Sequence, residues 1–181
     1  MKESRASYRY ALALLAVSEE AGQLEEVFRN LQFLEKLMKE SREFYQFLKS
    51  PVISAQRKKT IASGILEGHV SAITLKFVIL LVAKNREGIL QDIVIQFYRL
   101  RDERLGILNV TTRSAIAFSD AQGQDLSRQL EHVTKKKVRI TYILDPSLKG
   151  GFTVQHDDTV WDASVRHQLK VLRQRFVEGK A

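Results

Sequence analysis

The chain has 181 residues, of which 44% are hydrophobic and 28% charged, a composition typical of a globular protein with one large or two small domains. It contains no cysteine, which excludes disulfides, thiolate metal sites and a cysteine nucleophile. The formal net charge of +8 predicts an acidic partner, which could be protein, nucleic acid or anionic lipid. The apolar run from Tyr10 to Val17 is too short to span a bilayer, so we expect a soluble chain.

Helical periodicity extends from the start of the chain to about residue 105. The first predicted helix is apolar on nearly all faces, so we expect it to be buried on more than one side. Its main stripe consists of Tyr10, Ala13, Leu14 and Val17. A long amphipathic helix follows, with apolar residues at helical spacing from Leu24 to Met38.

Four more helices are predicted before residue 105. Ser41 caps a short one that ends before Pro51, and the next runs from Ser54 to near Gly68. The apolar side of that helix is formed by Ile61, Ile65 and Leu66. A fifth helix, capped by Ser71, is again apolar nearly all round. A sixth helix follows the turn NREG, and we expect its apolar side to face the core; that side consists of Leu90, Ile93, Val94, Phe97 and Leu100.

Beyond Gly106 the pattern changes to short strands alternating with helices. ILNVTTRSA, KKKVRITYIL and FTVQH are predicted strands, and TVWD extends the third after a bend. Ser119 and Gln122 have the spacing of a capping box, and the helix they begin has an apolar side made of Leu126, Leu130 and Val133. The last helix carries one stripe, Val165, Leu169, Leu172 and Phe176.

The predicted fold is therefore mainly α. Residues 1–105 should form an N-terminal six-helix bundle, and residues 106–181 should form a small α/β C-terminal domain. Short loops and only two prolines leave little material for a disordered linker.

The glycine pair Gly150–Gly151 is the one candidate for a phosphate-binding loop. Such a loop needs several glycines followed by the N-terminus of a helix, because backbone N–H groups and the helix dipole hold the anion. Here a strand pattern follows, and neither GxGxxG nor a Gly-Lys-Ser/Thr sequence is present. We interpret the pair as a turn or bulge.

A cluster of polar residues follows the third strand and raises the question of a metal site. It comprises His156, Asp157, Asp158 and Asp162. Side chains alternate across a strand, so His156 and Asp157 should point to opposite faces, and the other histidines are scattered. We interpret the cluster as a polar turn and expect neither metal nor cofactor.

The lysines at positions 135–137 could contact phosphate or form a solvated strand edge that discourages unwanted pairing. Aromatic residues that could stack on bases are not interleaved with them, which favours the strand edge. No Ser–His–Asp grouping or carboxylate pair can be assembled from the sequence, so an enzyme is the weaker hypothesis.

The two helices that are apolar nearly all round, the first and the fifth, allow two interpretations. Both helices could be central in the bundle. Alternatively, they could border a groove that accepts a helix from another protein. Periodicity alone leaves these alternatives open.

Several stretches match one known family in the same order. They are RYALALLAVSEE, FLKSPVISAQRKKTI, FVILLVAKNREGILQDIVIQFYRL and VRITYILDPSLKGGFTVQHDDTVWDASVRHQL. Together they cover essentially the whole chain, which resembles the delta subunit of bacterial and chloroplast F-type ATP synthases. The mitochondrial counterpart of this family is the oligomycin-sensitivity-conferring protein.

The most specific part of the resemblance is a signature turn in the C-terminal block. It contains Asp145, Gly150, Gly151, Phe152, Asp158 and Asp162. The chain departs from the family at Asp157 and Ala163, where glycine is usual, and at Asn85–Arg86–Glu87, where the family has Asn-Gly-Arg. These departures affect the local turn geometry.

The resemblance implies a non-catalytic stator subunit without a cofactor. It would link the catalytic alpha3beta3 head to the b subunits of the peripheral stalk and resist rotation during proton-driven ATP synthesis. By family position, the groove for the N-terminal helix of an alpha subunit comprises Tyr10, Ala13, Leu14, Phe77 and Leu81. The stalk b subunits would bind the last helix through Val165, Leu169, Leu172 and Phe176, unless those residues pack on the sheet.

The resemblance also implies a location. The chain would lie on the cytoplasmic face of a bacterial inner membrane, or on the stromal side of the thylakoid in a chloroplast, and would associate with the membrane only through the complex. The alternative function is a basic nucleic-acid-binding protein, in which KKKVRITY would be the contact strand and affinity for single strands would fall steeply with salt.

Overall fold

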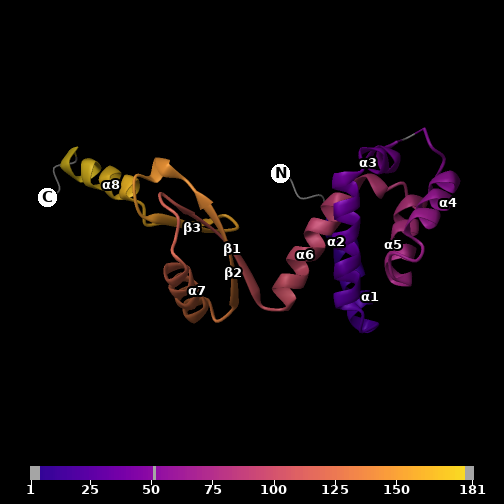
Figure 1. The fold of residues 1–181 in the computed structure, drawn as a ribbon, viewed down its shortest axis with the longest axis horizontal. Helices are drawn as coiled ribbons and strands as arrows, with labels where there is room; N and C mark the ends of the chain where they lie inside the picture. Colours follow the sequence, from indigo (N-terminus) through magenta and orange to yellow (C-terminus); the bar gives the residue numbers. More distant parts are fainter. Residues whose placement is uncertain (1–4, 51, 178–181) are drawn as a thin grey trace. The chain divides into compact units, whose positions relative to one another are not determined.

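The computed structural model describes residues 5–50 and 52–177, drawn as a ribbon in Figure 1. The chain divides into two compact units, Met1–Arg101 and Asp102–Ala181. The chain as a whole is mainly helical, as predicted, and it carries a four-stranded sheet. Among the described residues, no helix combines the length and apolarity that crossing a membrane requires.

The first unit is built from helices that begin close to the predicted positions. They are α1 (Arg5–Glu20), α2 (Leu24–Glu40), α3 (Arg42–Lys49), α4 (Ala55–Leu66), α5 (Ala72–Ala83), the 3-10 turn η1 (Glu87–Ile89) and α6 (Leu90–Arg104). Ser41, Ser54 and Ser71 each accept a backbone N–H bond at the start of a helix, which satisfies donors that a helix leaves free.

One core joins all six α-helices of this unit, and Phe97 of α6 is among its largest fully buried side chains. The prediction that α1 is buried on more than one side is wrong. It buries Ala11, Leu14 and Leu15, whereas Leu12 and Val17 on its outer side are 43% and 49% exposed. An apolar composition on all faces therefore does not mean that α1 is central.

The predicted inner face of α4 is correct for Leu66, which is buried, but wrong for Ile61 and Ile65, which are exposed. The residues of α4 that are buried are Lys58, Ala62 and Leu66. The Lys58 ammonium pairs with the buried Glu87 carboxylate and donates to the Leu48 carbonyl at 3.0 Å. A buried charge requires such partners, and with them Lys58 belongs to the buried side of α4, from which Ile61 and Ile65 are excluded.

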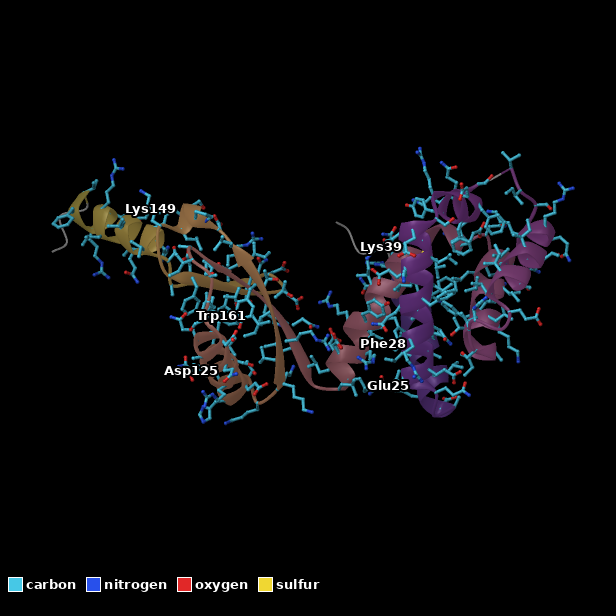
Figure 2. The ribbon with its side chains drawn as sticks, viewed as in Figure 1. Glu25, Phe28, Lys39, Asp125, Lys149 and Trp161 are labelled. Carbon is cyan, nitrogen blue, oxygen red and sulfur yellow. The ribbon has the colours of Figure 1, made fainter. Side chains whose placement is uncertain are left out.

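A second polar contact holds the start of α2 against α6. Arg101 Nη2 donates to Glu25 Oε1 at 2.6 Å, and its guanidinium lies 3.9 Å from the centre of the Phe28 ring. Glu25 and Phe28, labelled in Figure 2, are one turn apart on α2. The arginine therefore combines a charge-assisted hydrogen bond with a cation–π contact.

The second unit contains a sheet with strand order β2-β1-β3-β4, in which β1 and β2 are parallel and the other neighbours antiparallel. Its elements are β1 (Ile107–Ser114), α7 (Asp120–Thr134), β2 (Lys137–Leu144), the 3-10 turn η2 (Pro146–Leu148), β3 (Phe152–His156), β4 (Thr159–Asp162) and α8 (Val165–Val177). Ser119 and Gln122 form the predicted capping box of α7.

The prediction that TVWD extends the third strand is wrong. It forms a separate strand, β4, which pairs with β3 so that His156 lies opposite Thr159. Asp157 and Asp158 make the two-residue turn, with Asp157 at φ +47°. That left-handed conformation is tolerated by aspartate, so the chain reverses without a glycine.

The core of this unit is small. It consists of Leu108, Val110, Leu126 and Val154, with Phe118, Leu130, Val138, Ile140 and Phe152 packed around it. Val133, predicted to lie on the buried side of α7, is exposed. It shares a face with Leu126 and Leu130 but belongs to the last turn of α7, which therefore extends beyond the apolar residues that the helix covers.

Candidate interaction surfaces

The glycine pair of the signature turn lies where the chain before β3 contacts the start of α8. Gly151 has φ +70°, and a Cβ atom built on it would lie 2.3 Å from the Ala163 carbonyl oxygen. A Cβ atom on Gly150 would lie 2.9 Å from a methyl group of Val165. Both the left-handed backbone and the close approach require glycine at position 151.

Backbone hydrogen bonds join the same segments. The Val165 N–H donates to the Gly150 carbonyl at 3.0 Å, and the Ala163 N–H donates to the Phe152 carbonyl at 3.0 Å. The glycine pair is followed by β3 and not by a helix, so it lacks the helix N-terminus of a phosphate loop. Together these contacts between residues 150–152 and residues 163–165, which we call the clasp, fix the first residue of α8 to the sheet.

Two acids of the signature stabilise turns in this clasp. Asp145 Oδ1 accepts the Ser147 N–H at 3.1 Å, and Asp162 Oδ1 accepts the Ser164 N–H at 2.9 Å. The pKa of each carboxyl is lowered mainly by a side-chain hydrogen bond with the same serine, Ser147 or Ser164. These backbone bonds and the nearby Arg166 contribute to both shifts. Each acid therefore favours its charged form because that form holds a turn.

The clasp extends into the first turn of α8. Ser164 is fully buried, and its hydroxyl accepts the His167 N–H at 3.1 Å. The Arg166 guanidinium donates to Ser147 Oγ at 3.1 Å. Asp158 is not part of this group, because it lies in the turn between β3 and β4 at the other end of both strands.

The polar cluster at the β3–β4 turn does not converge on one point. His156 Nδ1 lies 3.0 Å from the Asn109 carbonyl oxygen, and Nε2 lies 3.6 Å from Asp157 Oδ2. In residues 5–50 and 52–177, no group of three His, Cys, Asp or Glu side chains could hold a metal ion. The arrangement is that of a polar turn.

The stripe on α8 remains on the surface of its unit. No described residue of α8 is buried, and the four side chains of the stripe are 38% to 74% exposed. They are Val165, Leu169, Leu172 and Phe176. An apolar stripe on an amphipathic helix that is left in solvent is typical of a surface that binds a partner.

The residues predicted for the alpha-subunit groove fall into two groups. Tyr10 and Phe77 bring α1 and α5 together through an edge-to-face ring contact, with centroids 6.5 Å apart, and Ala13 is exposed. Leu14, Phe77 and Leu81 are buried in the core. They lie behind the surface and support it from within.

Helical spacing identifies further residues of this surface. Val17 follows Tyr10 by seven positions and Ala13 by four, so the three share a stripe. On α5, Leu80 is one turn from Phe77. Val17 and Leu80 are both nearly half exposed. The spacing was visible in the sequence, but it could not show which apolar faces of α1 and α5 are turned to solvent.

The lysines at positions 135–137 are exposed at the beginning of β2, which is an edge strand of the sheet. This placement agrees with the interpretation as a solvated strand edge. Lysines at a free edge oppose uncontrolled strand pairing.

Comparison with known proteins identifies the family. The family model described as ATP synthase delta (OSCP) subunit matches residues 6–176. The ATP synthase subunit delta of Chlorobaculum tepidum is 40% identical over 181 residues and covers 100% of both chains. That of Chlorobium phaeovibrioides is 42% identical over 176 residues, which are 97% of each chain.

A solved structure shows the same fold at lower identity. A chain from the Toxoplasma gondii mitochondrial ATP synthase hexamer matches with a TM-score of 0.72 and 22% identity, over 96% of this chain and 98% of that one. The matches confirm the predicted role: the chain is a non-catalytic subunit with a stator function in ATP synthase. The chain belongs to the ATP synthase delta (OSCP) subunit family.

Proposed function

We propose that the first unit acts as a six-helix bundle that binds the N-terminal helix of an alpha subunit across α1 and α5, while α8 of the second unit binds the ends of the stalk b subunits. The chain would thereby hold the catalytic alpha3beta3 head to the peripheral stalk and resist rotation. We place it on the cytoplasmic face of the membrane, or on the stromal face in a chloroplast.

The observation that carries the proposal is the exposure of apolar residues on α1, α5 and α8. On α1 and α5 these residues flank the Tyr10–Phe77 contact, with Ala13 and Val17 on one side and Leu80 on the other. An amphipathic helix laid between them would cover apolar area that water now covers. The core beneath, including Leu14 and Leu81, keeps both helices fixed before binding.

The clasp at the signature turn supports the assignment to α8. A helix with no buried residue needs another means of attachment, and here backbone bonds from Ala163 and Val165 supply it. The stripe of α8 is therefore presented on an anchored helix, which lowers the ordering cost of binding.

The substitution Ala13→Asp tests the first half of the proposal. Because Ala13 is exposed, the variant should fold with unchanged helical circular dichroism. A charge in the apolar contact should weaken binding of a synthetic alpha N-terminal peptide by at least about tenfold. The matched control is Leu12→Asp, which places the same charge on an exposed residue of α1 that lies about 100° round the helix from Ala13 and off the stripe of Tyr10, Ala13 and Val17.

Calorimetric titration of both variants with the peptide gives a clear decision. The proposal requires Leu12→Asp to bind nearly as the natural chain does. Equal losses in the two variants would indicate a nonspecific charge effect, and undiminished binding by Ala13→Asp would place the alpha site elsewhere.

A further inference from the structure

The outer edge of β2 has the geometry of a second binding surface in the second unit, separate from α8. In the described part of the chain, β2 pairs with β1 on one side and with no strand on the other. Its C-terminal half is exposed, and Leu144 is 60% exposed. An open apolar strand edge is a template for pairing with another chain.

The hydrogen bonds between β1 and β2 identify which backbone groups are open. The Lys137 N–H donates to the Gly106 carbonyl, and the Asp145 N–H donates to the Ser114 carbonyl. Residues in a parallel ladder alternate between the two sides, so the odd-numbered residues of β2 bond to β1. The even-numbered residues therefore direct their backbone N–H and C=O groups to the open edge.

One of these outward groups is already satisfied. The Val138 N–H donates to Glu131 Oε1 at 3.1 Å, which confirms that even-numbered residues face away from β1. A side chain thus closes the first position of the edge. The positions that remain for a partner strand are Ile140, Tyr142 and Leu144.

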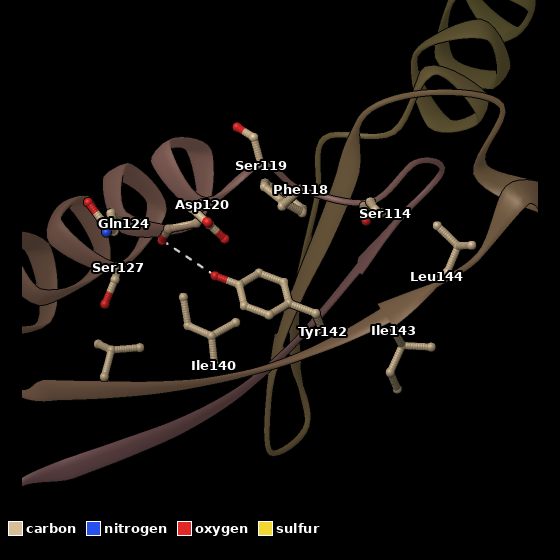
Figure 3. Close-up of a pocket in the computed structure, with 13 residues that line it drawn as sticks. Ser114, Phe118, Ser119, Asp120, Gln124, Ser127, Ile140, Tyr142, Ile143 and Leu144 are labelled. Carbon is tan, nitrogen blue, oxygen red and sulfur yellow. Dashed lines mark hydrogen bonds between the residues drawn. The ribbon is translucent and has the colours of Figure 1, made fainter.

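A depression of about 690 Å³ lies beside this edge, between β2 and α7. Figure 3 shows Ile140 and Tyr142 on the side of β2 that faces α7, whereas Ile143 points to the other side. The Tyr142 hydroxyl donates to the Gly123 carbonyl at 3.4 Å, and its ring lies 5.4 Å from that of Phe118. Alternate side chains of an added strand would enter this depression.

The charge at one end of the edge indicates the chemistry of the partner. Lys135, Lys136 and Lys137 are exposed where β2 begins, and no ion pair involves them within residues 5–50 and 52–177. Glu131 is the one acid shown bonding to this end of the strand. A second copy of the chain is a poor occupant, because each copy carries a net charge of +8.

We propose that the outer edge of β2 binds an extended protein segment by strand addition. The segment alternates apolar and polar residues, and carries acidic residues at the end that lies beside Lys135, Lys136 and Lys137. Main-chain bonds to Ile140, Tyr142 and Leu144 supply the affinity, and the depression under α7 selects the alternate side chains. The surface shares no residue with α8 or with α1 and α5.

Amide hydrogen exchange by NMR tests the proposal on the full chain. The probe is a synthetic peptide about as long as β2 that alternates valine and threonine and ends in glutamates. At about 100 times its dissociation constant, it should slow exchange of the Ile140, Tyr142 and Leu144 amides about a hundredfold. The odd-numbered amides of β2, already bonded to β1, should change little.

A proline substitution separates backbone pairing from side-chain contact. Leu144→Pro removes an outward N–H, which an edge strand tolerates, and should weaken peptide binding about fivefold through the lost hydrogen bond. Leu144→Ala removes the same side chain but keeps the N–H, and should bind more tightly than the proline variant. Equal affinity in the two variants would overturn strand addition.

Other outcomes also decide the matter. Equal binding of a peptide ending in lysines would overturn the charge argument, and displacement of the peptide by a single-stranded oligonucleotide would assign the edge to nucleic acid. Protection of the three amides that rises with protein concentration, without peptide, would assign the edge to a second copy. Slower exchange confined to α8 would overturn the proposed surface.

Discussion

The helices of the first unit share one continuous core, whereas the sheet of the second unit covers a small cluster of apolar residues and leaves others in solvent. Every α-helix from α1 to α6 contributes buried side chains to the first core, but α8 contributes none to the second. Helix packing stabilises the first unit, whereas the second combines strand pairing and a small core with backbone contacts such as the clasp at Gly151. The contrast suits a connector that stays rigid at one attachment and offers an apolar surface at the other.

The largest effect should come from breaking the buried pair of the first unit. Lys58→Met leaves the Glu87 carboxylate buried without its cation, which should cost about 3–5 kcal/mol in the free energy of unfolding. The double variant Lys58→Met, Glu87→Leu should recover most of that loss, because it removes both charges. Urea denaturation of the single and double variants measures both effects.

The matched control for this pair is Lys39→Met. Lys39 Nζ lies 2.6 Å from Glu35 Oε1, but the lysine is exposed, so losing the pair should cost less than about 1 kcal/mol. A similar cost for the two lysine substitutions would show that burial of the Lys58–Glu87 pair is energetically unimportant.

The second largest loss of stability should come from a substitution in the clasp of the second unit. Gly151→Ala combines a left-handed backbone with a clash against the Ala163 carbonyl, and should cost about 3 kcal/mol. Gly106→Ala is the control, since its φ is also positive but nothing lies within 4 Å of the added Cβ. It should cost about 1 kcal/mol. If the unfolding temperature fell equally in both variants, the close approach of Gly151 to the Ala163 carbonyl would not be the cause of the destabilisation.

Local features of both units were predictable from the sequence, because their causes are local. The serine caps at Ser41 and Ser71 and the capping box at Ser119 depend on residues within one turn. The inner face of α4 was not predictable, because Lys58 becomes a core residue only through Glu87, which is 29 positions away. Spacing and family resemblance likewise named Leu14 and Leu81 for the groove, but only tertiary packing decides that they are buried.

Acidification should also loosen the clasp, but by less than the Gly151→Ala substitution does. The pKa values of Asp145 and Asp162 are lowered in the folded chain, so their charged forms stabilise it at neutral pH. That stabilisation is lost as pH falls below about 4 and through the lowered values. Neither carboxyl is buried, so solvent screening should keep the effect of each small.

Amide exchange at Val165, corrected for its intrinsic rate, measures this loosening. In the Asp162→Asn variant, the Val165 amide should already exchange somewhat faster at neutral pH, and its exchange should change less on acidification. Protection of Val165 that stays constant through the acid range would contradict a role for the two carboxylates.

The smallest effect on stability is expected at α8. Leu169→Ser replaces an exposed side chain and should change the free energy of unfolding by no more than about 0.5 kcal/mol. Leu126→Ala, in the core of the same unit, should cost about 2–5 kcal/mol. Denaturant unfolding that gave Leu169→Ser a cost of that size would show that the α8 stripe is core.

The central claim is that the two units hold different partners, and a crossed binding measurement tests it most directly. The natural chain, Ala13→Asp and Leu169→Ser would each be titrated with an alpha N-terminal peptide and, separately, with an end segment of a stalk b subunit. We expect Ala13→Asp to lose only the alpha peptide and Leu169→Ser to lose only the b segment. The account would be contradicted if either variant lost both partners, or if both variants still bound both partners.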